Sequence, residues 1–315
     1  MQQNISVIIP SRNRSHLLQS CVLSIYKSQN SFPLLEIILV DNCTDTKESE
    51  TYQQIAETYN LIYCREAQPG LSKARNAGIR TAKGDVIVFA DDDFLVEPDW
   101  IKNLAIHFSE SKVASCTGRM ISHKKDEASQ LYERSNSFDR GSTGYRVTAK
   151  DMNIKNLIKT IPLTGNKRLG RNTPAPYSVG YGFCSFRRNV FQKVGLFDEK
   201  LGRGTPAIGS EDVDIFYRIL KAGYSIDYEP DAIVRHEHRA TLDAVLYDAY
   251  SSGVSVRAFT RKYMARDPYI FCLFIGNFFL LSFSLTKNIF TRDHALRQMI
   301  TQELKGFLVG KDKKH

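Results

Sequence analysis

The segment KGDVIVFADDD, at residues 83–93, is the most informative part of the sequence. Its middle, VIVFA at 86–90, is a short β-branched and apolar run, which is typical of a buried strand. Three aspartates, Asp91, Asp92 and Asp93, follow this strand directly. Adjacent carboxylates repel one another unless a cation or solvent neutralises them, and such oxygen ligands suit Mg²⁺ or Mn²⁺. An extended backbone would aim Asp91 and Asp93 one way and Asp92 the other. A solvated acidic turn is the alternative reading.

Outward from this segment, apolar strands alternate with helices along the first 120 residues. The alternation predicts an α/β fold with a doubly wound, mostly parallel sheet, flanked by helices and joined by right-handed crossovers. Ligands of such sheets bind beyond the carboxyl ends of the strands, so residues after each strand are candidates for a site. The other predicted strands are 5–9, 36–40, 62–65 and 113–120; the predicted helices are about 17–25, 47–59, 71–82 and one opening at Asp99.

The rest of the chain is less regular. Residues 122–178 are rich in Gly, Ser, Asn and basic residues and predict long loops. We expect an α/β domain over residues 1–240 and a helical C-terminal extension over 241–315. Within 122–240, order is predicted for a short helix near 188–194, a glycine-rich turn at 202–209, a helix at about 211–222 and two short strands at 224–228 and 232–234.

The segment GSEDVDIFYRIL, at 209–220, places acidic residues at the start of a helix. Its apolar residues recur at helical spacing. Ser210 is a plausible N-cap, so Glu211 and Asp212 fall in the first turn. A carboxylate held at a loop mouth suits a general base, but acidic residues also favour helix N-termini for electrostatic reasons alone. The pattern leaves both interpretations open.

Four single residues carry weaker signals. Asp41 follows a strand and could accept hydrogen bonds from a ribose or base, or be a turn aspartate. Arg75 could clamp an anionic group or be a solvated helix charge. Asp85, which opens the strand before the three aspartates, is equally ambiguous. His236 follows a strand and could complete a metal or pyrophosphate shell, or be an ordinary surface histidine.

Composition restricts the possible partners. The 315-residue chain has a formal net charge of +9, with much of the basic excess late in the sequence. Such charge suits nucleic acid, an anionic membrane or phosphorylated ligands, but without a recognition helix or zinc pattern we expect no nucleic-acid partner. Six scattered cysteines do not predict a disulfide framework, and the first strand begins too near Met1 for a signal peptide. We expect a cytoplasmic protein.

An apolar stretch of 17 residues runs from Tyr269 to Leu285. It is shorter than the roughly 20 residues of a spanning helix, and basic residues flank it on both sides. This pattern predicts a helix that lies in a membrane interface, with contact over 268–290, on the inner face of the cell membrane. A buried helix or an interface in a homo-oligomer is the alternative.

Five segments together resemble family 2 glycosyltransferases with the GT-A fold. The resemblance covers about residues 5–240, and the order of the segments makes it specific. It implies metal-dependent transfer of a sugar from a UDP-sugar to an acceptor hydroxyl with inversion, and Mn²⁺ or Mg²⁺ as cofactor. The segments are SVIIPSRNR at 6–14, LVDN at 39–42, LSKARNAGI at 71–79, KGDVIVFADDD at 83–93 and GSEDVDIFYRILKAGY at 209–224.

The resemblance also implies residue roles. Asp212 would be the catalytic base, Asp93 a metal ligand, and His236, or less so His238, would lie near the metal and diphosphate. Residues 1–120 would form the nucleotide-sugar half and 121–240 the acceptor half, with loops at 134–178 and 202–206 acting as lids. Asp41 would contact the uracil or ribose. The residues expected to bind the nucleotide-sugar are Pro10, Arg12, Asp41, Arg75, Asp85, Asp91 and Asp92.

The resemblance leaves the acceptor open, either a glycan or a lipid-linked molecule. The family's processive synthases carry a QxxRW motif that this sequence lacks, which implies single additions. A sugar-phosphate nucleotidyltransferase is an alternative, but it would want a glycine-rich loop after the first strand, where Pro10-Ser11-Arg12-Asn13 contains no glycine. A nucleotide-sugar-binding scaffold without activity is another, and the intact Asp93 and Asp212 argue against it.

Overall fold

A computed structural model describes residues 4–28, 32, 34–123, 130, 139–160, 173–179, 183–236, 241–288 and 294–310. In these residues one nine-stranded sheet has the order β3-β2-β1-β4-β8-β6-β9-β5, and β7 also pairs with β9. The strands are β1 Ile5–Ser11, β2 Glu36–Asp41, β3 Ile62–Arg65, β4 Val86–Phe89, β5 Phe94–Val96, β6 Val113–Ser122, β7 Tyr145–Val147, β8 Cys184–Arg187 and β9 Ser225–His236.

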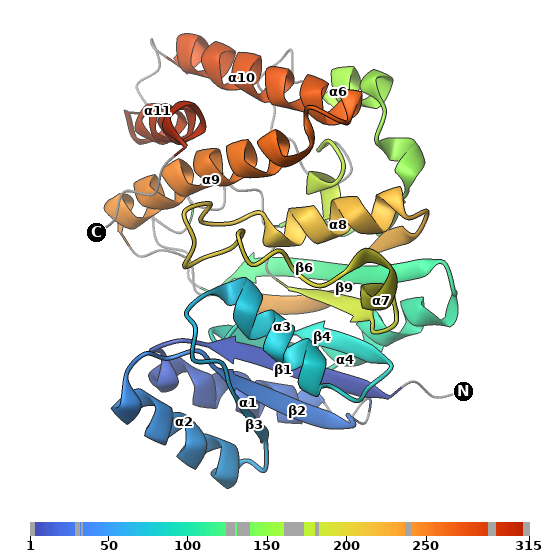
Figure 1. Cartoon of the computed structure of the whole chain (residues 1–315), viewed down its shortest axis with the longest axis vertical. Helices are drawn as coiled ribbons and strands as arrows, with labels where there is room; N and C mark the ends of the chain where they lie inside the picture. The colour runs from blue at the N-terminus through green and yellow to red at the C-terminus, as the bar shows by residue number, and fades with distance from the viewer. Residues whose placement is uncertain are drawn as a thin grey trace.

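Helices cover the sheet and build a separate layer above it (Figure 1). The α-helices are α1 Ser15–Ser28, α2 Thr46–Thr58, α3 Leu71–Thr81, α4 Trp100–Ala105, α6 Ile154–Thr160, α7 Val190–Val194, α8 Glu211–Lys221, α9 Leu242–Tyr263, α10 Pro268–Asn288 and α11 His294–Val309. The 3-10 helices within the described residues are η1 Ile106–Ser109, η2 Ala149–Asp151 and η4 Tyr177–Val179.

Strands β3, β2, β1 and β4 are parallel, as the alternation predicts. Side chains of β1 alternate between two apolar layers, because Val7 packs in the layer that contains α1 and Ile8 packs in the layer that contains α3. Helix α3 lies close to β1, since a Cβ placed on Gly78 would be 2.4 Å from Ile8 Cγ2. Only glycine allows this approach, which brings the start of α3 to the carboxyl edge of the sheet.

The other half of the sheet is mixed. Strand β8 pairs antiparallel with both β4 and β6, whereas β6 and β9 are parallel. The two strands predicted at 224–228 and 232–234 are one strand, β9, whose register against β6 shifts between Gly118 and Arg119. Pro230 lies in this shifted part, where its missing N–H costs no regular ladder bond. The sequence pattern does not predict β5, β7 and β8, which are short and pair with strands that are distant in the chain.

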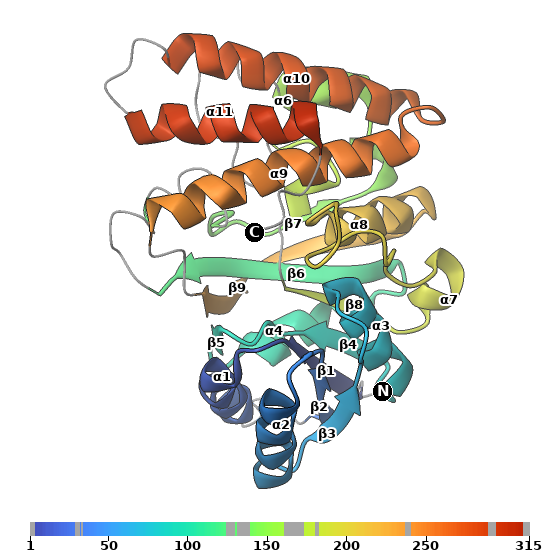
Figure 2. The ribbon, with the colours of Figure 1, turned by 60° about the vertical axis from the view of Figure 1, so that its left-hand side comes forward.

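Helix α8 lies between the sheet and the three C-terminal helices (Figure 2). Its Phe216 packs with β8, and its Tyr217 packs with Phe259 of α9 and Leu273 of α10. Helices α9 and α11 approach closely, because a Cβ on Gly253 would be 1.9 Å from the Glu303 carbonyl oxygen. Among the helices that the structure describes, α10 alone has the length and hydropathy to cross a membrane, with mean hydropathy 1.8 over Pro268–Thr286.

A charged network fixes the turn before β6 against β9. His107 Nδ1 lies 2.7 Å from Asp227 Oδ2, and its Nε2 lies 2.8 Å from Glu229 Oε2. Only the imidazolium form can donate to both carboxylates. These hydrogen bonds, first that to Asp227 and then that to Glu229, raise the pKa of His107 to about 9.

We expect the free energy of unfolding to fall by about 1–3 kcal/mol as the pH rises from 6.5 through about 9. The folded-state pKa of His107 lies above its ordinary value of 6.5, so the stabilisation is complete below pH 6.5 and is lost above pH 9. Urea unfolding of wild type and His107→Gln over this range measures the effect. The same pH dependence in both proteins would show that another group is responsible.

Candidate active site

The carboxyl edge of the sheet gathers the acidic residues. Asp91, Asp92 and Asp93 follow β4, and Ser11 ends the neighbouring strand β1. The extended alternation expected for the three aspartates is not formed, because Phe94 N donates to the Asp91 carbonyl oxygen (3.1 Å) and closes a turn. The turn separates the side chains: Asp91 faces α3, whereas Asp92 and Asp93 face the loop after β1.

Arg14, in the loop after β1, neutralises two of the aspartates. Its Nη1 lies 2.8 Å from Asp92 Oδ1 and its Nη2 lies 2.7 Å from Asp93 Oδ2. Ser11 Oγ also donates to Asp92 Oδ2 at 2.6 Å. His236, at the end of β9, places Nε2 3.5 Å from Asp93 Oδ2. Asp92 therefore contacts Arg14 and Ser11. Asp93 lies between the guanidinium of Arg14 and the imidazole of His236.

The three aspartates differ in acidity. Burial raises the pKa of Asp91 to about 6 and that of Asp92 to about 7, although Arg75 and Arg14 respectively oppose the rise. Burial would also raise the pKa of Asp93, but His236 and Arg14 hold it below its ordinary value. Asp93 is consequently the carboxylate that stays ionised most firmly, as a metal ligand must.

The residues at this turn fit a divalent cation whose coordination shell is completed by a bound ligand. Asp93 Oδ1 is buried and has no hydrogen-bond partner among the residues that the structure describes. Within that same part of the chain, no group of three His, Cys, Asp or Glu side chains could hold a metal alone. Mg²⁺ is commonly bound by one or two carboxylates together with substrate phosphates, and Asp93 offers this kind of incomplete site.

Arg75 connects the acidic turn with the start of α8. The guanidinium is 1% exposed; its Nη1 lies 2.8 Å from Glu211 Oε1 and its Nη2 lies 3.7 Å from Asp91 Oδ1. The rings of Phe89 and Phe197 lie within 5.6 Å and 5.4 Å of it. This buried ion pair brings two motifs that lie far apart in the sequence into one site.

Asp212 lies next to this ion pair. It is the second residue of α8, its exposed fraction is 7%, and its Oδ1 accepts a hydrogen bond from Val213 N. Ser210 precedes the helix as expected, but it has a left-handed backbone (φ 65°) and its side chain makes no capping hydrogen bond. The position of Asp212 is therefore set by the surrounding structure rather than by a local cap.

The remaining nucleotide candidates lie at different places. Pro10 is buried in β1, and Arg12 is exposed in the loop after it. Asp41 is fully buried: Tyr63 OH donates to its Oδ2 at 2.6 Å, and Arg65 Nη1 lies 2.7 Å from its Oδ1. Burial would raise the pKa of Asp41, but its hydrogen bonds, first that from Tyr63, lower it. A base or ribose would reach Asp41 only by displacing one of these partners.

Asp85 is not brought to this edge. It precedes β4, whereas the three aspartates follow it, so about six residues of extended chain, roughly 20 Å, separate the two ends. Its exposed side chain accepts a hydrogen bond from Asn4 N at 3.4 Å. The expectation that Asp85 holds the nucleotide together with Arg75 does not agree with this placement. His238, the second histidine considered, lies outside the described residues.

Two site residues were given no role from the sequence, Arg14 and Glu211. Both had a readable signal, because Arg14 follows the strand next to the acidic one and Glu211 adjoins the predicted base.

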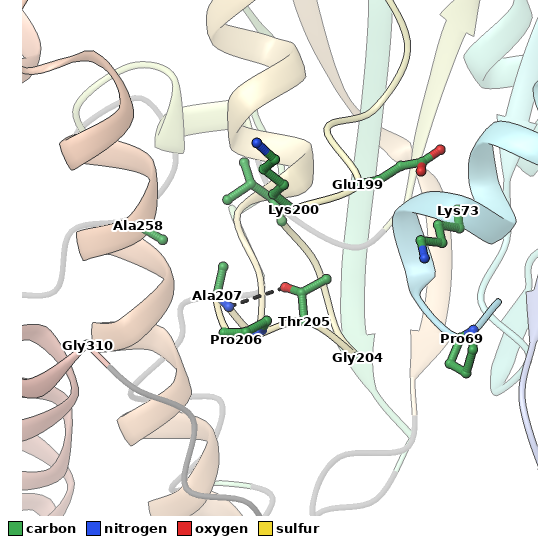
Figure 3. A pocket seen from close by; sticks show the side chains of 11 residues that line it. Pro69, Lys73, Glu199, Lys200, Gly204, Thr205, Pro206, Ala207, Ala258 and Gly310 are labelled. Carbon is green, nitrogen blue, oxygen red and sulfur yellow. Dashed lines mark hydrogen bonds between the residues drawn. The ribbon is translucent and has the colours of Figure 1, made fainter.

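A cavity of about 560 Å³ opens beside the site, between the start of α3, the 199–207 segment and α9 (Figure 3). It contains none of the three aspartates; its Gly204 lies near Arg12, since a Cβ there would be 3.7 Å from Arg12 Nη1.

Comparisons with known proteins identify the family of this chain. The model of Glycosyl transferase family 2 matches residues 6–195. An O-antigen chain rhamnosyltransferase of Salmonella typhimurium is 27% identical over 257 residues, which are 79% of this chain and 71% of the relative.

Solved structures resemble the whole chain. A mannosyltransferase from Pyrobaculum calidifontis, in complex with GDP-Man and Mn²⁺, has a TM-score of 0.65 at 14% identity and covers 98% of this chain and 87% of its own. GalNAc-T7 with UDP, GalNAc and Mn²⁺ has a TM-score of 0.58 at 18% identity, over 98% of this chain and 56% of its own. At these identities the likeness shows the fold alone, and it confirms the expected GT-A fold with a C-terminal helical region. Because the family model spans more than half of the chain, this protein belongs to glycosyl transferase family 2 and is a glycosyltransferase.

Proposed function

We propose that the protein transfers a single sugar from a nucleoside-diphosphate sugar, UDP-sugar in the first instance, to an acceptor hydroxyl, with Mn²⁺ or Mg²⁺ as cofactor. The observation that carries this proposal is the Arg75 bridge between Asp91 and Glu211. It supports a common site for the metal-binding turn and the acidic start of α8. One similar structure contains GDP-Man and Mn²⁺, and the other contains UDP, GalNAc and Mn²⁺, which agrees with this chemistry for those proteins.

Asp93 would hold the cation, with His236 beside it and with donor phosphate oxygens completing the shell. The cation would supply positive charge for the diphosphate that leaves when the anomeric bond breaks. Arg12, exposed after β1, would bind the nucleotide, and Asp91 would orient the sugar from the Arg75 side. These roles keep the donor on the β1 and β4 side of the site.

Asp212 would accept the proton of the acceptor hydroxyl. A base must lie within hydrogen-bond reach of that proton, and the first turn of a helix holds a carboxylate rigidly. Attack from the α8 side, opposite the leaving diphosphate, would invert the anomeric centre. Because the chain is a family 2 glycosyltransferase, the inactive scaffold and the nucleotidyltransferase are not retained as alternatives.

We further propose that α10 places the enzyme on a membrane surface. Its outward stripe contains Phe271, Ile275, Phe279 and Phe283, which are 48%, 37%, 65% and 52% exposed. These residues recur at helical spacing, while the opposite side of α10 packs in the core with Leu273. Basic residues precede α10 in the sequence, which suits anionic lipid. A lipid surface covers such a stripe without requiring a protein partner.

The donor site predicts a metal-dependent stabilisation by nucleotide. UDP with Mn²⁺ should raise the melting temperature of wild type more than UDP alone, because Asp93 and the diphosphate would both bind the cation. Asp93→Asn should lose the Mn²⁺-dependent part, whereas Asp212→Asn should keep it. A thermal-shift series with UDP, GDP and other nucleoside diphosphates measures this and ranks the bases. An unchanged Mn²⁺ effect in Asp93→Asn would remove Asp93 from the metal site.

If Asp212 is the base, its substitution should lower the turnover rate and leave donor binding nearly unchanged. Asp212→Asn should lower kcat by about 10²–10⁴-fold, with a small change in KM for the donor, because an amide cannot accept the acceptor proton. Release of UDP, with a panel of UDP-sugars and candidate acceptors, measures the rate. Wild-type turnover in Asp212→Asn would require a different base.

The α10 stripe predicts binding to anionic vesicles. Phe279→Ser/Phe283→Ser should reduce co-sedimentation with vesicles that contain phosphatidylglycerol at least fivefold, because two exposed rings no longer enter the interface. Leu23→Ser is the matched control, since Leu23 is 42% exposed on α1 at another part of the molecule. Equal sedimentation of the double variant and the control would contradict membrane contact through α10.

A further inference from the structure

Asp214 is a buried carboxylate that the proposed mechanism does not use. It lies on α8 two residues after Asp212 and is 0% exposed. Arg218, one turn further along α8, donates from Nε to Asp214 Oδ2 at 2.9 Å. The other oxygen, Oδ1, accepts from Lys262 Nζ at 2.6 Å and from Tyr263 OH at 2.7 Å. Asp214 therefore connects the helix of the proposed base with the end of α9.

Lys262 makes a second ion pair, with the segment that precedes α8. Its Nζ lies 2.6 Å from Asp198 Oδ2. Asp198 begins the segment that leads into α8, and three residues later the Leu201 carbonyl accepts a hydrogen bond from Ser72 Oγ of α3 (2.7 Å). One ammonium thus fixes both α8 and the chain that enters it. Charge-assisted hydrogen bonds of this kind are short and strong.

The entry to α8 requires such support. Ile208 and Ser210 both have left-handed backbones, with φ of 61° and 65°. This conformation is unfavourable for a β-branched residue and persists only when the surroundings hold it. Since Ser210 does not cap the helix, the position of Asp212 depends on the ion pair between Glu211 and Arg75 and on contacts made further along α8. Lys262 and Tyr263 supply those contacts from α9.

We infer that Lys262 is a positioning residue for catalysis: through Asp214 and Asp198 it holds α8 so that Asp212 faces the acceptor hydroxyl. This inference rests on the proposed role of Asp212 as the base. It gives the C-terminal helices a part in the reaction that is separate from membrane contact. The donor side of the site lies on β1, β4 and α3, whereas both carboxylates that Lys262 binds lie on α8 and the segment before it.

Lys262→Met should lower kcat at least tenfold and leave KM for the donor within twofold, because small displacements of a catalytic group are costly. Lys262→Arg should recover most of the rate, since guanidinium can still bridge two carboxylates. The control is Lys102→Met, which removes a lysine that is 55% exposed and lies 3.8 Å from Asp99. Rates are measured well below the melting temperature of each variant.

A double-mutant cycle separates positioning from general destabilisation. If Lys262 acts through Asp212, Lys262→Met should cost less than twofold in kcat when Asp212 is already Asn. An additional tenfold loss in the Asp212→Asn background would overturn the inference, and so would wild-type kcat in Lys262→Met. If Lys262→Met does not fold, Tyr263→Phe, which removes one hydrogen bond to the same oxygen, takes its place in the cycle.

The cycle also distinguishes the two proposals. Near wild-type kcat in Asp212→Asn contradicts the proposed base itself. A large loss in Asp212→Asn together with no loss in Lys262→Met contradicts only the positioning role.

Discussion

The buried ion pair between Arg75 and Glu211, with Asp91 at its other side, is the interaction on which the site depends. A fully desolvated guanidinium is costly unless carboxylates compensate it, so Arg75 can remain at 1% exposure only while both partners are in place. Its two aromatic neighbours add favourable cation–π contacts. Because the three residues belong to α3, the turn after β4 and α8, the pair determines how these elements meet.

The pKa values of the three aspartates differ because the arginine side chains are distributed unevenly around the acidic turn. Arg75 and Arg14 each neutralise part of the negative charge, and Ser11 further engages Asp92. Asp93 retains a buried oxygen without a partner among the described residues, although its pKa is the lowest of the three. A polar atom in that condition is a destabilising feature unless a ligand completes it. This oxygen is the atom that a bound cation would engage in the proposed site.

The parallel half of the fold and the acidic edge could be predicted from the sequence because both follow from local pattern. Continuous apolar strands such as 5–9 and 86–90 alternate with helices, and the polarity of the strands puts the three aspartates at 91–93 at the ligand edge. The same rule would have excluded Asp85, which precedes its strand. Strands β5 and β8 could not be predicted, since their few residues are defined by partners distant in the chain. The preference of Arg14 over Arg12 for the aspartates likewise depends on the path of a loop.

In the proposed site a divalent cation would join Asp93 to a donor diphosphate. Anomalous scattering from crystals grown with Mn²⁺ and UDP locates this cation. We expect one strong manganese peak within about 2–2.5 Å of a carboxylate oxygen of Asp93 and of the diphosphate. A peak elsewhere, or bound UDP with no manganese beside Asp93, would contradict it.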